Sequence, residues 1–167
     1  MALGDVINDV GLADYGQGGI KEVSPDGSKL AVSDGAVLTI IDLSDGSEIN
    51  SGTPSGIAGD ITAFEWHANS SLVAVGDNSG NYVTFDISNF TTTTVYDGLS
   101  QSLSNPVKAF AMTSEDPASN PTIIAADDSG NIKISDITSG SFIEAYNGQG
   151  GTTVNDLKLS PDETHVV

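Results

Sequence analysis

The stretch Leu72-Val-Ala-Val-Gly-Asp-Asn-Ser-Gly-Asn-Tyr-Val-Thr-Phe-Asp86 decides the fold. Its two apolar runs flank an Asp/Asn/Ser/Gly turn, a pattern that predicts two antiparallel strands joined by a tight hairpin. The same pattern returns at Lys29–Asp42 and at Thr122–Asp136. The aspartates that close the three copies are separated by 44 residues (42 to 86) and by 50 residues (86 to 136). A repeat of this length made only of short strands is typical of a β-propeller, in which each repeat forms one four-stranded blade.

Three complete repeats follow one another along the chain. We expect blade 1 at residues 20–53, blade 2 at 61–98 and blade 3 at 107–148. The alternation of apolar and polar residues predicts strands a, b, c and d of each blade at residues 20–23, 29–33, 37–42 and 47–51, then 61–66, 72–77, 81–86 and 91–96, then 107–112, 122–127, 132–136 and 141–146. Residues 113–121 form an insertion between the first two strands of blade 3, and we expect them to be a surface loop.

A fourth repeat is divided between the two ends of the sequence. Residues 154–167 match strands a and b of a blade, and residues 1–19 match strands c and d. Strand c is expected at Asp5–Asp9 and strand d at Leu12–Tyr15. The predicted fold class is therefore all-β: a single β-propeller unit over residues 1–167, with four blade-equivalents of four antiparallel strands and one blade split between the termini.

The repeats resemble those of the WD40 family of β-propellers. The Ser-Pro-Asp pieces within Val23–Val32 and Leu157–Asp162, with Phe64–His67 between them, look like that family's a–b turn. Asp128–Asp136 looks like its b–c hairpin. The Ser-Pro-Asp-Gly and Ile-Ile-Asp-Leu pieces also resemble bacterial YVTN-type propellers. The resemblance implies a platform for protein interactions rather than a reaction.

The chain departs from the WD40 pattern at two places. The tryptophan of the Trp-Asp pair is replaced in every repeat, and the family's Gly-His pair near strand d is absent. A buried His–Asp network is therefore not implied. The replacing residues are Ile41, Phe85, Ser135 and, in the split repeat, Asn8.

A split blade must be completed, because unpaired strand edges expose main-chain donors and acceptors. The chain could close on itself as a four-bladed ring, pair with further copies, or take a strand from a different protein. A fragment with accidental ends is a further alternative. We expect pairing between copies, as a dimeric eight-bladed ring or a filament, so the expected partners are further copies in a homo-oligomer or another protein. The expected interface residues are Asp5, Val6, Ile7, Leu12, Leu157, Leu159, His165, Val166 and Val167.

The charge of the chain excludes some classes of partner. Its 23 acidic residues face five lysines and no arginine, for a net charge of −18. Nucleic acids and anionic membranes need clustered basic residues, so neither is expected as a partner. The acidic residues indicate a solvated surface. The absence of cysteine is compatible with either redox compartment, and the absence of a visible signal peptide favours a cytoplasmic protein.

The sequence offers little catalytic chemistry. His67 and His165 lie far apart in the sequence, and neither belongs to a zinc-binding or nucleophile motif. We expect no enzyme and no cofactor; a hydrolase with its site at the mouth of the ring is the weaker alternative. A calcium-dependent binding module is the stronger alternative, because acidic turns with alternating oxygen ligands suit Ca²⁺. The candidate ligands are Asp77, Asn78, Asp127 and Asp128.

The same acidic residues also suit ordinary turns. Asp, Asn, Ser and Gly tolerate the backbone angles of β-hairpins and bind their own main chain. We favour this interpretation for the b–c turns. The closing aspartates Asp42, Asp86 and Asp136 are likewise expected to accept main-chain N–H bonds in the turn from strand c to strand d.

Overall fold

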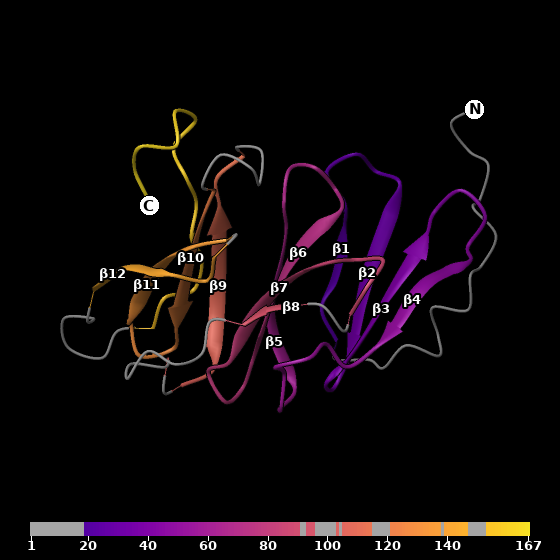
Figure 1. The fold of residues 1–167 in the computed structure, drawn as a ribbon, viewed down its shortest axis with the longest axis horizontal. Coiled ribbons are helices and arrows are strands. Elements are labelled where there is room, and N and C mark those ends of the chain that lie inside the picture. Colours follow the sequence, from indigo (N-terminus) through magenta and orange to yellow (C-terminus); the bar gives the residue numbers. More distant parts are fainter. Residues whose placement is uncertain are drawn as a thin grey trace.

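The computed structural model describes residues 19–90, 93–95, 103, 105–114, 121–137, 139–146 and 153–167. These residues form three antiparallel four-stranded sheets that stand side by side (Figure 1). Strands adjacent in the sequence are also adjacent in each sheet. The three sheets correspond to the expected blades 1, 2 and 3, and the blade names are kept below.

Each sheet is a meander of four consecutive antiparallel strands. Blade 1 contains β1 (Lys21–Val23), β2 (Lys29–Asp34), β3 (Val37–Asp42) and β4 (Glu48–Gly52). Blade 2 contains β5 (Ile61–Trp66), β6 (Leu72–Asp77), β7 (Tyr82–Asp86) and β8 (Thr93–Val95). Blade 3 contains β9 (Val107–Met112), β10 (Thr122–Asp127), β11 (Ile132–Asp136) and β12 (Phe142–Tyr146). These bounds lie within two residues of those that alternation predicts.

The middle strands of blade 2 are apolar on both faces because the blade is packed between two neighbours. On β6, Val73 and Val75 join the core shared with blade 1, while Ala74 joins the core shared with blade 3. All three side chains are fully buried. Because successive side chains of a strand point to opposite faces, this run of small and β-branched residues supplies both cores at once.

Two apolar cores hold the three blades together. The first joins Leu38 and Ile40 of blade 1 to Phe85 of blade 2, and Trp66 reaches across it to donate its indole N–H to the Glu22 carbonyl at 3.2 Å. The second core joins Tyr82 of blade 2 to residues of β9 and β10 in blade 3. Burial of this apolar area is the main stabilising term of the fold.

After blade 3 the chain turns back as a short hairpin, residues 157–167, which we call the C-terminal hairpin. The main-chain N–H of Lys158 donates to the carbonyl of Val167, and the Val167 N–H donates to the carbonyl of Lys158, both at 2.9 Å. Leu157 is buried in a third core with Ala109, Ala111 and other blade 3 residues. The hairpin is thus attached to the outer face of blade 3, where a following blade would pack.

Several expectations fall on parts of the chain that are not described. The N-terminal strands expected at residues 5–9 and 12–15 lie outside the described residues, as does most of the insertion at 113–121. Within the described part of the chain, no helix is long and apolar enough to cross a membrane.

Candidate functional site

The turn of the C-terminal hairpin has the same hydrogen bonds as the a–b turn of blade 1. In blade 1, the Ser24 side-chain oxygen accepts the Lys29 N–H at 3.0 Å, and the Ser24 hydroxyl lies 2.6 Å from Asp26 Oδ1. In the hairpin, the Ser160 oxygen accepts the His165 N–H at 3.0 Å, with an equivalent bond from the Ser160 hydroxyl to Asp162.

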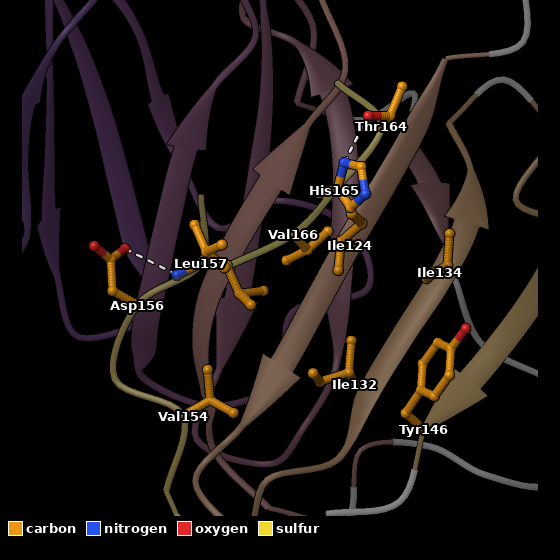
Figure 2. Close-up of a pocket in the computed structure, with 11 residues that line it drawn as sticks. Ile124, Ile132, Ile134, Tyr146, Val154, Asp156, Leu157, Thr164, His165 and Val166 are labelled. Atoms are coloured by element: carbon orange, nitrogen blue, oxygen red, sulfur yellow. Dashed lines mark hydrogen bonds between the residues drawn. The ribbon is translucent and has the colours of Figure 1, made fainter. Parts of the chain in front are cut away.

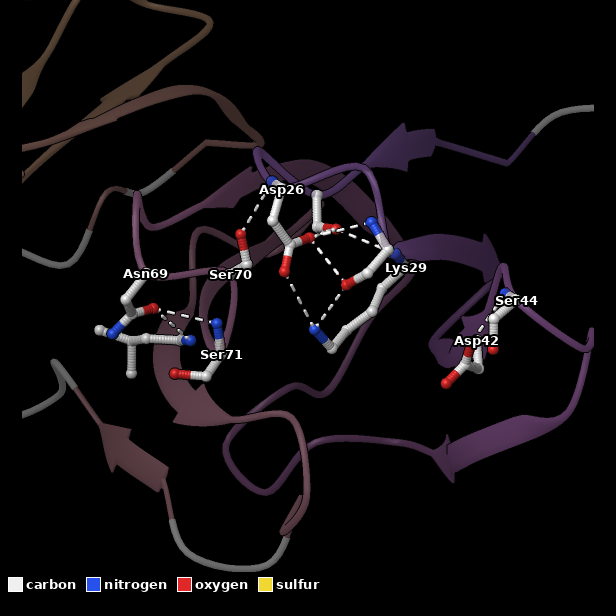
Figure 3. A network of polar contacts seen from close by, with 10 residues as sticks. Asp26, Lys29, Asp42, Ser44, Asn69, Ser70 and Ser71 are labelled. Carbon is white, nitrogen blue, oxygen red and sulfur yellow. Dashed lines mark hydrogen bonds and ion pairs between the residues drawn. The ribbon is translucent and has the colours of Figure 1, made fainter. Parts of the chain in front are cut away.

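The bonds to Asp26, with the Lys29 ammonium 3.6 Å from its other oxygen, appear in Figure 3. Hydrogen bonds from the Ser24 hydroxyl and from Ser28 hold the pKa of the Asp26 carboxyl well below its usual range. Hydrogen bonds from Ser160 and Thr164 lower the pKa of the Asp162 carboxyl in the same way. The hairpin therefore repeats the local structure with which blade 1 begins.

The pairing register of the hairpin also matches blade 1. Val23 pairs with Leu30 in blade 1, and Leu159 pairs with Val166 in the hairpin. Because Lys158 and Val167 exchange their hydrogen bonds, the N–H and C=O of Val166 point to the opposite side of the strand. Within the described residues these two groups have no partner. The second strand of the hairpin thus presents an open edge, where blade 1 has its third strand.

An apolar groove lies next to this open edge. It has a volume of about 570 Å³ and is bounded by blade 3 on one side and the hairpin on the other (Figure 2). Blade 3 contributes Ile132 and Ile134 of β11 and Tyr146 of β12, whose side chain is 50% exposed. Val166, 38% exposed, lines the groove from the hairpin. In blades 1 and 2 the corresponding face is covered by the next sheet, so the groove is an uncovered part of a surface that is otherwise core.

The first strands of the repeats converge at a smaller acidic pocket of about 300 Å³. Glu22 of β1, Glu65 of β5 and Asp156 beside the hairpin line it, together with Lys158. The pKa of Glu65 is raised to about 7, chiefly by burial and also by the charges of Glu22 and Asp156, with Lys158 acting in the opposite direction. Burial also raises the pKa of Glu22. Attachment of the hairpin therefore places negative charge close to a half-buried carboxyl group.

The carboxylates proposed as calcium ligands hold the main chain together. Both Asp77 and Asp127 are fully buried. Asp77 Oδ1 accepts the N–H groups of Ser79 and Asn81 at 2.9 Å, and Oδ2 accepts the Asn81 side-chain amide at 2.8 Å. Asp127 Oδ1 binds the equivalent N–H groups of its own turn at the same distances. A cation could bind here only after these N–H donors had been displaced.

The turn residues next to these aspartates have main-chain roles. The Asn78 N–H donates to the carbonyl of Asp60, and the Asp128 N–H donates to the carbonyl of Pro106. Each bond ties a b–c turn to the segment that enters the first strand of the same blade. Among the described residues, no three Asp, Glu or His side chains gather closely enough to hold a metal ion.

The closing aspartates form the turns that their position suggests. Asp42 accepts the Ser44 N–H at 2.7 Å (Figure 3), and Asp86 accepts the Ser88 N–H at 2.9 Å. Asp136 accepts the Ser139 N–H at 2.7 Å. Each side-chain oxygen accepts the N–H of a residue two or three positions further along the chain, in place of a main-chain carbonyl, as in an Asx-turn.

The structure brings together the C-terminal half of the expected interface. Leu157 is buried, Leu159 packs beside it, and His165, Val166 and Val167 are exposed along the hairpin. The other expected interface residues lie outside the described part of the chain: Asp5, Val6, Ile7 and Leu12.

Sequence reasoning missed the blade 3 side of the groove. Ile132, Ile134 and Tyr146 were assigned to strands without a role at the split blade. The signal that could have found them is comparative: β8 is rich in threonine, whereas β12 carries exposed Phe142, Ile143 and Tyr146. Exposed apolar side chains gathered on one strand are a candidate interaction surface, and Tyr146 is the one of these three that lines the groove.

A comparison with protein families identifies the fold family. The family described as the Rax2 C-terminal beta propeller domain matches residues 44–165, well over half of the sequence. The chain belongs to this family. The match to the Rax2 C-terminal β-propeller domain begins near the end of β3 and ends within the C-terminal hairpin, so it includes the hairpin's turn. It supports a β-propeller without assigning the repeats to the WD40 or YVTN type. No curated protein matches the chain significantly.

Proposed function

We propose that this chain is a non-enzymatic scaffold or self-assembling structural subunit with WD40-like repeats. In this proposal the half-blade at the C-terminus is completed by strands c and d from the N-terminal residues of another copy. The open edge of Val166 beside the hairpin's internal hydrogen bonds is the observation that carries it. An edge with free N–H and C=O groups is a template for another strand, and membership of a β-propeller family makes a blade strand the natural occupant.

The chemistry of the edge supports strand addition over side-chain recognition alone. Main-chain hydrogen bonds give general affinity, and apolar side chains beside the edge give specificity. The groove next to the edge is lined mostly by aliphatic side chains, which favours a strand with apolar residues at alternate positions. The net charge of −18 opposes association at low salt, so added salt should strengthen it by screening.

The test is the mass of the particle in solution. Native mass spectrometry and sedimentation at micromolar concentration should give two or more chains per particle for the full sequence. Deletion of residues 1–15 should give a monomer that keeps its β-sheet circular dichroism. A control substitution on the outer strand of blade 3, Ile143→Ser, lies outside the groove and should leave the mass unchanged. A full-length chain that stays monomeric, or a deletion that leaves the oligomer intact, would contradict assembly through the termini.

A further inference from the structure

We infer that the apolar groove between blade 3 and the C-terminal hairpin binds residues 5–10 of a second copy, as a strand in which Asp9 lies opposite His165. The inference rests on the proposed function and adds three things to it. It gives the strand a binding surface, a pairing register and a donor chain.

The register follows from the match between the hairpin and blade 1. Ser160 takes the place of Ser24 and His165 takes that of Lys29, as their shared hydrogen bonds show. In blade 1, Lys29 pairs with Asp42 of strand c. Asp9 is the aspartate that closes the N-terminal half of the split repeat, as Asp42 closes strand c of blade 1. The equivalent pair in the completed blade is therefore His165 with Asp9.

The faces of the added strand follow from the complete blades. In blade 2, Val83, Phe85 and Ile87 of β7 and its following turn pack in the core shared with the preceding blade 1. In blade 3, Ile137 packs in the core shared with blade 2, and Ser135 lies 3.4 Å from the Tyr82 hydroxyl. Strand c of a blade thus directs this set of positions toward the preceding blade.

The corresponding positions in the N-terminal segment are Val6, Asn8 and Val10. They alternate along the chain, so they share one face of a strand. Set beside the open edge, this face meets Ile132 and Ile134 of blade 3, which now line the groove. Two valines would then cover aliphatic side chains that the hairpin alone leaves uncovered. In the added strand, Ile7 would take the other face, toward the blade that follows.

The donor is a second copy because the chain's own N-terminal half-blade belongs beside blade 1. The expected strand d ends at about Tyr15, and β1 begins at Lys21, so only a few residues would connect them. The Ile20 N–H donates to the Ser33 hydroxyl oxygen at 2.9 Å, which fixes the start of this path on blade 1. Figure 1 shows blade 1 at one end of the row of sheets and the C-terminal hairpin at the other. We therefore take a second copy as the donor, and the chain's own N-terminal residues are the alternative that the cross-linking experiment distinguishes.

Disulfide trapping tests the register and the donor together, since the chain has no cysteine of its own. One preparation carries Asp9→Cys and a second, distinguishable by mass, carries His165→Cys. Non-hydrogen-bonded partners in antiparallel strands lie about 4.5 Å apart at Cα, within the range that a disulfide spans. Mild oxidation of the mixture should give a disulfide-linked heterodimer on a non-reducing gel. Each preparation oxidised alone should give far less dimer.

The control for register replaces Asp9→Cys by Asn8→Cys. A one-residue slip turns the side chain to the other face of the strand, so this pair should cross-link at least several-fold more slowly. Equal rates would overturn the register. A disulfide that forms only within a single chain carrying both cysteines would overturn the second copy as donor and indicate a four-bladed monomer.

Substitutions in the groove test its role independently of the edge. Val6→Asp places a charge against aliphatic side chains and should weaken association roughly tenfold or more. Tyr146→Ser should also weaken it, whereas Ile143→Ser on the same strand should not; the two side chains are 50% and 53% exposed, but only Tyr146 lines the groove. If association requires residues 1–15 but is unchanged by the substitutions at Val6 and Tyr146, the groove is not the binding surface. The proposed function would still hold. A monomeric full-length chain would refute both.

Discussion

The buried carboxylate of Asp77 accepts a hydrogen bond from the main-chain N–H of Gly59 at 3.0 Å, and this bond ties the b–c turn of blade 2 to the segment that enters its first strand. The neighbouring N–H of Ala58 donates to the same oxygen at 3.0 Å. Together with the bonds from its own turn, Asp77 holds two loops that a blade needs in fixed relation. Asp127 makes a related contact in blade 3, where it accepts the Asn105 side-chain amide at 3.3 Å.

Asp77→Ala should lower the free energy of unfolding by about 3 kcal/mol or more, because several buried N–H groups lose their acceptor at once. Denaturant unfolding followed by circular dichroism measures this loss. Asp86→Ala is the matched control: Asp86 is exposed, and within the described residues its carboxylate accepts hydrogen bonds from Ser88 in the next turn, so its loss should cost about 1 kcal/mol or less. Equal costs would show that the link to the entering segment contributes little.

The same carboxylate should make the protein sensitive to acid. Burial raises the pKa of Asp77, but hydrogen bonds from Asn81, Ala58, Gly59 and Ser79 outweigh burial and leave the pKa below its usual value of 3.8. The stability that these bonds contribute is therefore present above that pH and is lost as the pH falls through the lower, folded-state pKa. In Asp77→Asn the acid-dependent part of the unfolding free energy should be smaller than in the parent chain. An unchanged acid profile would contradict this assignment.

Gly80 and Gly27 occupy turns for two different reasons. Its φ is +85°, and a Cβ there would overlap the carbonyl oxygen of Leu103, in the segment that leads to blade 3. Gly27 also has a positive φ, +71°, but a Cβ there would meet nothing. Gly27→Ala should therefore cost about 1 kcal/mol, whereas Gly80→Ala should cost about 3 kcal/mol or more. If both variants lose similar stability in thermal unfolding, the segment at Leu103 moves to accommodate the added Cβ at no energetic cost.

The sequence predicted the strands well because each has a local cause. Alternation and turn residues specified β5, β6, β9, β10 and β11, whose bounds agree with those expected. The outer strands β4 and β12 have exposed faces and weaker alternation, and both begin one residue after the predicted start. Spacing of the repeats was sufficient for the β-propeller class, which the family match supports, while the four blade-equivalents and the split blade stay predictions.

Only the hairpin side of the candidate site was predictable from the sequence. The Ser-Pro-Asp turn at Ser160 is a local signal, and it located the hairpin correctly. The groove depends on which residues of blade 3 remain uncovered when only two strands pack against it, and this is a tertiary property. Ile132 and Ile134 have the same pattern as a covered strand, so no local rule distinguishes them. The raised pKa of Glu65 arises in the same way, from segments that are distant in sequence.

Calcium should have no effect on the stability or assembly of the chain. The oxygens of Asp77 already accept N–H donors at 2.8 to 3.0 Å, and a cation would have to break these bonds. Thermal unfolding and sedimentation with millimolar Ca²⁺ and with a chelator should therefore coincide. A ligand that binds only the folded state raises its stability, so a calcium-dependent rise in the unfolding temperature, reversed by the chelator, would favour the calcium-binding module.

Glu65 should make the protein less stable as the pH rises through neutrality. Because its folded pKa of about 7 is above the ordinary 4.5, its contribution is fully present below pH 4.5 and is lost as the pH rises through 7. The expected loss between about pH 5.5 and about pH 8 is of the order of 1–3 kcal/mol. Glu65→Gln should remove most of this dependence and stabilise the protein at the higher pH, as measured by denaturant unfolding at both values. Glu48→Gln, on an exposed part of β4, is the control and should leave the profile unchanged.

Replacing Val166 by proline tests the proposed assembly while leaving the hydrogen bonds that close the hairpin in place. The Val166 N–H points to the open side of the strand, while His165 and Val167 make the hydrogen bonds that close the hairpin. Proline removes one outward donor and places its ring where the added strand would lie, so Val166→Pro should abolish association. Val166→Ala keeps the N–H and should weaken association much less. Sedimentation gives the particle mass, and hydrogen exchange at Lys158 and Val167 reports whether the hairpin survives. A proline variant with an intact hairpin and an unchanged mass would show that the chains meet elsewhere.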